Sequence, residues 1–404
     1  MMTELSAGFL PLTDSAILIA AKEMGFAEAE DIALNLVRET SWANVRDKLA
    51  VGQFEVSHAL APMPIASNLG LTPFDTRLIA PMALGLGGNA ITVGNVLLAE
   101  MRDLGGFSGL DAKAAGRALF EVVAAGKSRG DKPLQFGVVH PFSGHNFELR
   151  YWLSASGIAP DEDVEIVILP PSLMADALAS GQIDGYCVGE PWNSIGVAKG
   201  AGRIITTKSS IWASSPEKVL AVREDWADEN AQTLHALLRA LYRSAEWCGQ
   251  SSNHLELVSL LSSPDYLGQS VDVILPALDG SILGEASSAT LPDFFQPHDR
   301  AATFPWQSHA LWFYSQMVRW GYVTHSADNA EIARRSYRPD IYRAVLSGIG
   351  VPVPSANSKV EGALKQKTAV GASSQFLYLG PDGFFDGAIF DPEELDAYIA
   401  SQSD

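Results

Sequence analysis

The sequence predicts an α/β protein built from two similar lobes, and two observations carry this prediction. Short apolar runs typical of buried strands alternate with segments of helical spacing along the first half of the chain. Two distant segments, DKLAVGQFEVSHALAP at 47–62 and DALASGQIDGYCVGEP at 176–191, also share one pattern of apolar, glycine, glutamine, acidic and proline positions. Each copy occupies the same place in a β-α-β order. This order favours mostly parallel sheets that bind ligands at the carboxyl ends of their strands.

The repeated segment reads as a helix, a turn and a buried strand. A glycine, Gly52 or Gly181, is expected to end the helix because glycine readily adopts the left-handed conformation found there. The chain then turns through glutamine into an apolar strand. The strand is expected to stop at Pro62 or Pro191, because proline has no N–H to donate to a neighbouring strand.

The remaining elements follow in order. In the first half, GFLPL and DIALNLVRE read as strands, and the segments TDS and TSW after them read as helix starts. In the second half, LQFGVV and DVEIVIL read as strands, each followed by a helix. Beyond residue 200, RIITT and EKVLAVR are further strands, and long amphipathic helices follow. We expect residues 1–88 and 195–345 to form the first lobe and 89–194 the second. We expect 346–404 to be an extended tail that packs back on the lobes.

Composition excludes several classes of function. The net charge of −19 argues against direct binding of nucleic acid, which needs clustered Lys and Arg. Two cysteines are too few for a disulfide framework or a zinc site of their own. No apolar stretch is long enough to span a membrane. The N-terminal segment MMTELSAGFLPLTDSAILIAAKEMGF does not have the pattern of a signal peptide, so we expect a cytoplasmic protein.

Familiar catalytic and cofactor motifs give little support for an enzyme. The segment GLGGNA at 85–90 resembles the start of a dinucleotide fingerprint, but no clear helix, strand and acidic residue follow it. These glycines are better interpreted as a crossing between the lobes, and we expect no cofactor and no metal. His58, inside the first repeat strand, is interpreted as structural. Glu190 is expected to hydrogen-bond to backbone at the hinge, with a general-base or metal-ligand role as the alternative.

His145 is expected in the first turn of a helix that directly follows a strand. The strand is LQFGVV at 134–139, and Ser143 is a suitable N-cap for the helix. In open α/β sheets, ligands gather where strands give way to helices.

Four hydrogen-bond donors lie at such junctions between strands and helices. They are the indole of Trp42, the amide of Asn89, the imidazole of His145 and the ammonium of Lys218, with Gly189 at the end of the second repeat strand. If the two lobes face each other, all of them point into one cleft. A set of donors with one cation suits a small planar oxyanion.

Several longer motifs, spread over nearly the whole chain, resemble the nitrate- and bicarbonate-binding family of bilobed solute receptors. They are LPLTDSA, SWANVRDKL, SGHNFELRYWL, CVGEPWN, SPEKVLAVREDW and FFDGAIFDP. The resemblance implies a type II periplasmic-binding-protein fold that closes around its ligand. It also implies that Trp42, His145 and Lys218 contact nitrate, and that Asn89 stands where the family has a glutamine.

The resemblance also ranks the possible functions. The bicarbonate branch is thought to place an acidic residue and a metal near the position of Lys218, so the lysine favours nitrate or nitrite. Together with the N-terminal segment, the resemblance implies a cytosolic nitrate/nitrite sensor, not an enzyme, that sequesters an RNA-binding transcription antiterminator and releases it on ligand binding. The first alternative is the nitrate- or bicarbonate-binding component of an ABC importer. The second is an enzyme similar to the thiamine-pyrimidine synthases, which share the fold.

Overall fold

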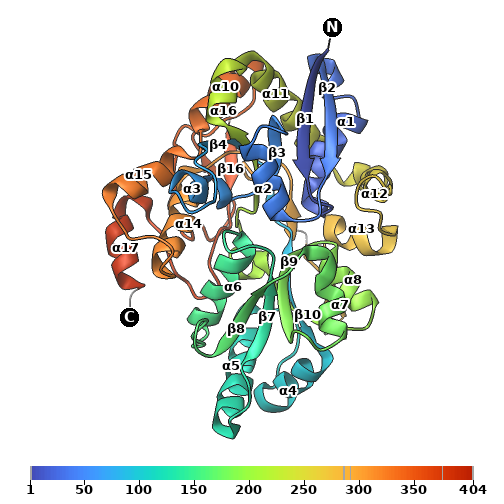
Figure 1. The fold of residues 1–404 in the computed structure, drawn as a ribbon, viewed down its shortest axis with the longest axis vertical. Helices are drawn as coiled ribbons and strands as arrows, with labels where there is room; N and C mark the ends of the chain where they lie inside the picture. The colour runs from blue at the N-terminus through green and yellow to red at the C-terminus, as the bar shows by residue number, and fades with distance from the viewer. Residues whose placement is uncertain (1, 285–286, 292, 375, 403–404) are drawn as a thin grey trace.

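The computed structural model of the 404-residue chain contains two large sheets, drawn in the upper and lower halves of Figure 1, and two small sheets of two strands each among its described residues. It describes residues 2–284, 287–291, 293–374 and 376–402. The upper sheet has the order β2 (Ile32–Arg38), β1 (Thr3–Phe9), β3 (Val56–Leu60), β11 (Lys218–Arg223) and β4 (Leu78–Ala83). β1 is parallel to β2 and β3, whereas β11 is antiparallel to β3 and β4.

The lower sheet has seven strands. Their order is β13 (Ser287–Thr290), β12 (Ser281–Gly284), β10 (Gly202–Thr207), β6 (Asn89–Gly94), β9 (Gly185–Gly189), β7 (Leu134–Val138) and β8 (Val164–Ile168). β7 is parallel to β8 and β9, but β6 runs antiparallel to both β9 and β10. The expected α/β fold is confirmed, with each sheet mixed rather than mostly parallel.

Helices cover both sheets. In chain order they are α1 (Ala16–Glu23), α2 (Trp42–Ala50), α3 (Met63–Asn68), α4 (Asn95–Gly105), α5 (Ala112–Arg129), α6 (Gly144–Ala155), α7 (Met174–Ala179), α8 (Trp192–Ala198), α9 (Lys208–Ile211), α10 (Glu224–Glu229), α11 (Ala231–Cys248), α12 (His254–Leu261), α13 (Val271–Asp279), α14 (Gln307–Arg319), α15 (Ala327–Arg335), α16 (Pro339–Leu346) and α17 (Leu395–Ser401). Short 3₁₀ turns are η1 (Thr13–Ser15), η2 (Glu28–Glu30), η3 (Pro171–Leu173), η4 (Ser251–Asn253), η5 (Ser347–Ile349) and η6 (Pro392–Glu394). No helix among these described residues is long and apolar enough to cross a lipid bilayer.

The repeated segments form the same local structure in both sheets. α2 and α7 are followed by Gly52 and Gly181, whose φ angles are +75° and +71°, as expected for a left-handed residue after a helix. The chain then enters β3 or β9, two strands that are buried along their whole length. Both strands end just before the proline of the repeat. The predicted helix–turn–strand unit is therefore confirmed.

The predicted lobe boundaries agree with the sheets only in part. Residues 195–345 were assigned to the first lobe, but β10, β12 and β13 lie in the lower sheet, so the assignment is wrong for these strands. The chain therefore crosses between the sheets after β4, after β10 and again before β12. A local pattern cannot reveal this, because a strand shows its own periodicity but not which distant strand it pairs with.

The glycine-rich segment is one of these crossings. Here β5 (Leu86–Gly87) pairs with β14 (Phe295–Gln296), and the chain continues directly into β6 rather than into a helix. Gly87 has a φ of +76°, and a side chain there would overlap the carbonyl oxygen of Phe294. The segment therefore differs from a dinucleotide-binding turn, in which a helix N-terminus faces the phosphates.

The last part of the chain packs against both halves of the molecule. It contains β15 (Thr368–Val370), β16 (Leu377–Leu379) and α17, and α17 packs on α14. Phe384 stacks on Trp212 with ring centroids 4.6 Å apart, and Tyr151 of α6 donates a hydrogen bond of 2.8 Å to Asp386. A buried group that we name the C-terminal cluster anchors this segment to α14. It consists of His309, Lys359, Glu361 and Asp382.

Candidate functional site

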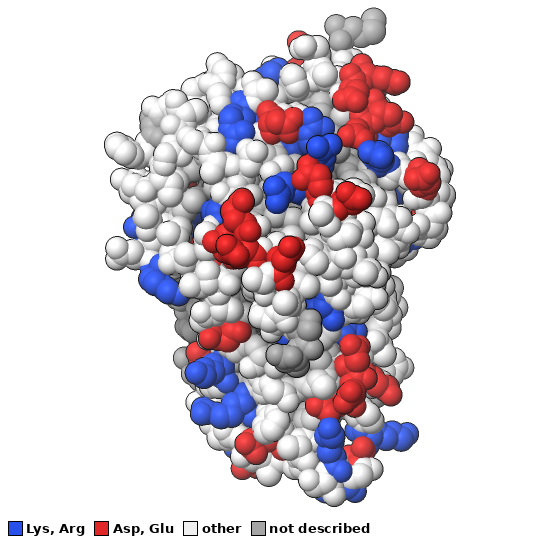
Figure 2. Space-filling model, turned by 90° about the vertical axis from the view of Figure 1, so that its left-hand side faces the viewer, with Lys and Arg blue, Asp and Glu red and all other residues white. Residues whose placement is uncertain are grey.

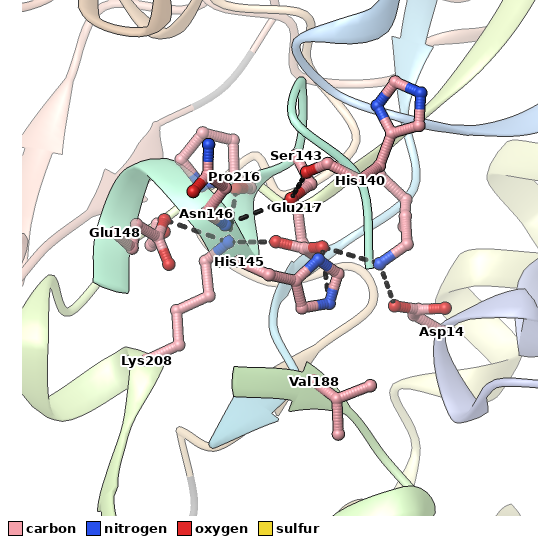
Figure 3. Close-up of polar contacts among 12 residues, drawn as sticks. Asp14, His140, Ser143, His145, Asn146, Glu148, Val188, Lys208, Pro216 and Glu217 are labelled. Carbon is pink, nitrogen blue, oxygen red and sulfur yellow. Dashed lines mark hydrogen bonds and ion pairs between the residues drawn. The ribbon is translucent and has the colours of Figure 1, made fainter. Parts of the chain in front are cut away.

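His145 lies where the sequence placed it, in the first turn of α6 just after β7. The Ser143 side chain caps this helix by accepting a 3.0 Å hydrogen bond from the backbone N–H of Asn146. The hydroxyl of Ser143 also donates to the backbone carbonyl of His140 at 2.7 Å, which fixes the turn between strand and helix. The His145 side chain is fully buried and points away from solvent toward the upper sheet's Glu217 (Figure 3).

Lys218, the first residue of β11, is also fully buried. Its ammonium lies 2.7 Å from Asp14 Oδ2 and 2.7 Å from Glu217 Oε1. The same ammonium stands 5.3 Å from the centre of the Trp42 ring, a cation–π distance. Trp42 begins α2, which is capped by Ser41 just as α6 is capped by Ser143. The upper sheet thus supplies a cation with an aromatic face beside it.

Asn89 and Gly189 face each other across β6 and β9 in the lower sheet. A Cβ atom built on Gly189 would lie 3.2 Å from the side-chain oxygen of Asn89 and 3.6 Å from Asp14 Oδ2. Asp14, which follows β1 in the upper sheet, holds Lys218. All five residues singled out in the sequence therefore meet in one buried region between the sheets.

Three of these side chains carry polar atoms that have no hydrogen-bond partner among the described residues. They are Trp42 Nε1, both amide atoms of Asn89 and both ring nitrogens of His145. Each side chain is at most 1% exposed. An unsatisfied buried polar group costs about 1–3 kcal/mol, so several of them around one buried ammonium indicate a place where a ligand supplies the missing acceptors.

The sequence did not point to the carboxylates and the second lysine of this site. Lys208, at the start of α9, donates to Glu217 Oε2 and lies 3.0 Å from Glu148 Oε1. Glu148 in turn accepts a hydrogen bond from the Ser215 hydroxyl. We name the whole chain of charges the interlobe cluster, and Figure 3 shows Asp14 at one end and Glu148 at the other. Its members are Asp14, His145, Glu148, Lys208, Glu217 and Lys218.

The charges of the cluster stabilise one another. Burial acts to raise the pKa of Asp14, but the Lys218 ammonium and His58 outweigh it and lower the pKa to about 2. Burial opposes ionisation of Glu217 in the same way, yet His145 and the two lysines hold its pKa well below the ordinary range. Both carboxylates are therefore ionised at neutral pH.

Burial dominates at two other titratable groups of the cluster, His145 and Glu148. It lowers the pKa of His145 to about 3, so the imidazole is neutral near pH 7. It raises the pKa of Glu148 to about 7, although the Lys208 ammonium opposes this shift. A neutral imidazole donates one hydrogen bond and accepts another, so His145 presents a single N–H.

Two further interpretations from the sequence can be compared with the structure. Glu190 Oε2 accepts a 3.1 Å hydrogen bond from the backbone N–H of Ser194, so the expected contact with backbone is confirmed. His58 was interpreted as structural, but it lies next to the site. Its Nε2 is 3.1 Å from Asp14 Oδ1, and its ring packs against Trp42 at 5.4 Å. His58 is the middle residue of β3, so no local signal in the sequence indicated this contact.

The part of the chain that the structure describes contains no group of three or more His, Cys, Asp or Glu arranged to hold a metal ion. Cys187 is buried, and burial raises the pKa of its thiol well above the usual range. A thiol in that state is a poor nucleophile.

With this geometry in hand, similarity to known proteins can be assessed. A family model described as NMT1-like matches residues 2–262. The chain belongs to this family. The chain is also similar to the nitrate/nitrite binding protein NrtA of Synechococcus elongatus (strain ATCC 33912 / PCC 7942 / FACHB-805), at 33% identity over 406 residues that cover 97% of this chain and 84% of NrtA.

Two further relatives extend the comparison. The nitrate import ATP-binding protein NrtC of Synechocystis sp. (strain ATCC 27184 / PCC 6803 / Kazusa) is 34% identical over 354 residues, covering 86% of this chain but only 50% of NrtC. The chain thus spans about half the length of that relative. The crystal structure of the periplasmic nitrate-binding protein NrtA from Synechocystis PCC 6803 matches with a TM-score of 0.86 at 28% identity, over 99% of this chain and 98% of that one. The predicted periplasmic-binding-protein fold is therefore confirmed.

Proposed function

We propose that this protein is a receptor for nitrate or nitrite, bound between the two sheets by Trp42, Asn89, His145 and Lys218 beside Gly189. One observation carries the proposal. Donors on Trp42, Asn89 and His145 are buried around the ammonium of Lys218 and make no hydrogen bond to any residue that the structure describes. Nitrate and nitrite only accept hydrogen bonds, so they satisfy such donors without bringing a donor of their own. The names of the relatives NrtA and NrtC agree with this ligand.

The energetics of such a site are sufficient for tight binding. Micromolar affinity requires about 8 kcal/mol, and a charge-assisted hydrogen bond contributes about 1.5–3 kcal/mol. Three or four such bonds suffice if the site is largely formed before binding. The capped first turns of α2 and α6 fix Trp42 and His145 in advance, which keeps the ordering cost low.

Bicarbonate is the second candidate, and a specific observation favours it. Asp14 Oδ2 and Glu217 Oε1 both lie 2.7 Å from the Lys218 ammonium, so carboxylate acceptors border the site. Bicarbonate carries an O–H group that can donate to a carboxylate, whereas nitrate has none. These acceptors are the chief feature of the site that nitrate does not explain.

Calorimetric titration of the purified protein with nitrate, nitrite, bicarbonate and sulfate tests the ligand. The buffer must be free of all four anions. We expect micromolar binding of nitrate or nitrite and none of sulfate. Binding of bicarbonate alone would replace the first candidate by the second. Absence of binding by all four anions would leave the thiamine-pyrimidine-synthase-like enzyme to be tested, although the buried thiol of Cys187 and the binding-protein relatives speak against it.

We further propose that the bound anion is a signal, and that the protein sequesters an RNA-binding transcription antiterminator in the cytoplasm and releases it on binding. The resemblance to the nitrate/nitrite sensors supports this role. A ligand that contacts both lobes favours their closed arrangement. It can thereby weaken the binding of a partner that prefers the open arrangement. The net charge of −19 suits a basic partner, and Figure 2 shows several acidic patches on one face, separated by Lys and Arg.

The alternative role is that of the substrate-binding component of an ABC importer. Affinity purification of the full chain from its native cells, grown without nitrate and eluted first with chloride and then with nitrate, distinguishes the two roles. Recovery of an RNA-binding protein specifically in the nitrate eluate supports the sensor. Recovery of a membrane permease instead supports the importer.

A further inference from the structure

Glu217 contacts the two side chains that face the proposed anion most directly. Its Oε1 lies 2.7 Å from Lys218 Nζ and 3.3 Å from His145 Nε2. A carboxylate is planar, negatively charged and delocalised over its oxygens, and nitrate and nitrite share all three properties. In this structure Glu217 therefore makes contacts of the kind that a bound nitrogen oxyanion would make with the same two groups.

The other oxygen of Glu217 is held by a second cation. Lys208 Nζ donates to Glu217 Oε2 and also to the backbone carbonyl of Pro216 at 2.7 Å. The space on this side exists because residue 144 is glycine. A side chain at Gly144 would overlap Glu217 Oε2 and come within 3.0 Å of Lys208 Nζ. Glu217 can therefore remain paired with Lys208 if it gives up Lys218.

We propose that Glu217 is an internal competitor of the anion, and that the ligand binds by displacing its carboxylate from Lys218 and His145 toward Lys208. The inference rests on the proposed function and deepens it, because it assigns the residue that sets affinity. Glu217 satisfies Lys218 before the ligand arrives, and its charge opposes any anion that enters. Lys208 limits this opposition because it neutralises the displaced carboxylate.

Competition of this kind also affects selectivity. The repulsion between Glu217 and an entering anion is proportional to the charge of that anion. Glu217 therefore repels a sulfate dianion about twice as strongly as nitrate at the same distance. The positive charges of Lys218 and Lys208 are already paired with Asp14 and Glu148, so they do not offset this extra repulsion. Glu217 thus favours monovalent anions by excluding divalent ones, a specificity gained from repulsion rather than attraction.

The first test is calorimetric titration of Glu217→Gln with nitrate. The glutamine keeps the shape of the side chain and removes its charge, so we expect nitrate to bind about tenfold more tightly than to the wild type. Sulfate binding should become measurable in the same variant. Unchanged or weaker nitrate binding by a folded Glu217→Gln protein overturns the inference.

The C-terminal cluster offers a matched control. Glu361 is fully buried, pairs with Lys359 and lies 3.3 Å from His309 Nε2, so it repeats the surroundings of Glu217 away from the site. Glu361→Gln should leave nitrate affinity unchanged. Equal tightening in both variants would show a general effect of removing negative charge, and would also overturn the inference.

A second pair of variants decides the matter if Glu217→Gln does not fold. In Lys208→Met, the Glu217 carboxylate keeps only Lys218 and His145 as partners, so it should be harder to displace and nitrate binding should weaken about tenfold. Lys208→Arg keeps the positive charge and should retain wild-type affinity. Wild-type affinity in Lys208→Met overturns the inference. Failure of the wild-type protein to bind nitrate or nitrite would instead contradict the proposed function, so the two failures are distinguishable.

Discussion

Two buried clusters in this protein contain the same kinds of side chain, yet only one has the character of a binding site. The C-terminal cluster and the interlobe cluster each hold lysine, carboxylates and a histidine whose Nε2 lies 3.3 Å from a glutamate. In the C-terminal cluster, the Ser308 hydroxyl donates to Glu361 at 2.7 Å and the backbone N–H of Leu364 donates to Asp382 at 2.8 Å. The carboxylates of this cluster therefore receive their hydrogen bonds from nearby residues of the fold.

The interlobe cluster differs in its surroundings. Next to it stand Trp42 Nε1 and the amide of Asn89, which find no partner among the described residues. Such groups alone do not set it apart, because His309 Nε2 in the C-terminal cluster and Trp212 Nε1 beside it likewise find none there. Its members come from both sheets, whereas the C-terminal cluster ties one segment to one helix. The comparison shows that buried charges by themselves do not indicate a ligand. Nor do unsatisfied donors beside a charge. What sets the interlobe cluster apart is that such donors gather where elements of both sheets meet.

The largest effect should follow from removal of the cation in the interlobe cluster. Lys218→Met leaves Asp14 and Glu217 without the ammonium that lies 2.7 Å from each. We expect nitrate affinity to fall at least a hundredfold (about 2.7 kcal/mol) and the free energy of unfolding to fall by about 3 kcal/mol. Calorimetry and urea denaturation measure the two quantities. Retained nitrate binding would disprove the assignment of Lys218.

The C-terminal cluster should respond in stability alone. Glu361→Gln removes one of the two carboxylates that hold Lys359, and we expect the free energy of unfolding to fall by about 2 kcal/mol. Nitrate affinity should stay within twofold of the wild type. A clear loss of nitrate binding would mean that the two clusters are coupled, and the distinction drawn between them would fail.

His145→Ala should weaken nitrate binding about tenfold, because it removes a buried donor whose ring nitrogens make no hydrogen bond to the described residues and whose Nε2 lies 3.3 Å from Glu217 Oε1, the carboxylate that the anion would replace. His309→Ala is the matched control and should leave affinity unchanged. Both variants should stay folded in circular dichroism. Equal affinities for His145→Ala and the wild type, measured by calorimetry, would remove His145 from the site.

One glutamate from each cluster, Glu148 and Glu361, should give opposite pH slopes. Burial raises the pKa of Glu148 from 4.5 to about 7, so the folded state binds the extra proton and stability falls as pH rises from 4.5 to 7. Burial opposes ionisation of Glu361, but Lys359 and His309 lower its pKa to about 2, so its contribution is lost as pH falls from 4.5 to 2.

Denaturation of variants between pH 2.5 and 8 measures these slopes. Glu148→Gln should remove part of the decline in stability between pH 4.5 and 7. Burial also raises the pKa of Glu190 to about 7, so Glu190 should account for the rest of that decline. Glu361→Gln should remove part of the loss below pH 4.5. Identical profiles for both variants would show that the two carboxylates do not differ in the way the structure indicates.

The smallest effect should come from Trp42→Phe. An aromatic face toward Lys218 is retained, whereas the indole N–H and part of the ring volume are lost, so nitrate affinity should fall about fivefold with a modest loss of stability. Trp312→Phe is a suitable control because its Nε1 is also buried and makes no hydrogen bond to the described part of the chain, next to Trp212. A fall in affinity in the control as large as that in Trp42→Phe would argue against a direct contact.

The sequence predicted the parts of the site that local chemistry controls. Ser143 and Ser41 cap their helices through contacts three residues away, so the positions of His145 and Trp42 after their strands could be inferred. Gly52 and Gly181 end the repeated helices because of their left-handed backbone. Lys218 was singled out as a donor at such a junction, and the family resemblance pointed to the same residue. These features depend on a few neighbouring residues, which a sequence displays directly.

Only the tertiary structure decided how the charges meet. Asp14 is 204 residues from Lys218, and Ser215 is 67 from Glu148, so no local pattern connects them. The same holds for β10, which pairs with β6 in the lower sheet rather than joining the first lobe. Sequence spacing does not determine such contacts, because the pairing of distant strands and the strength of buried charges depend on what surrounds them. The sequence by itself therefore determined the donors and their local geometry, and the fold decided which carboxylates those donors share.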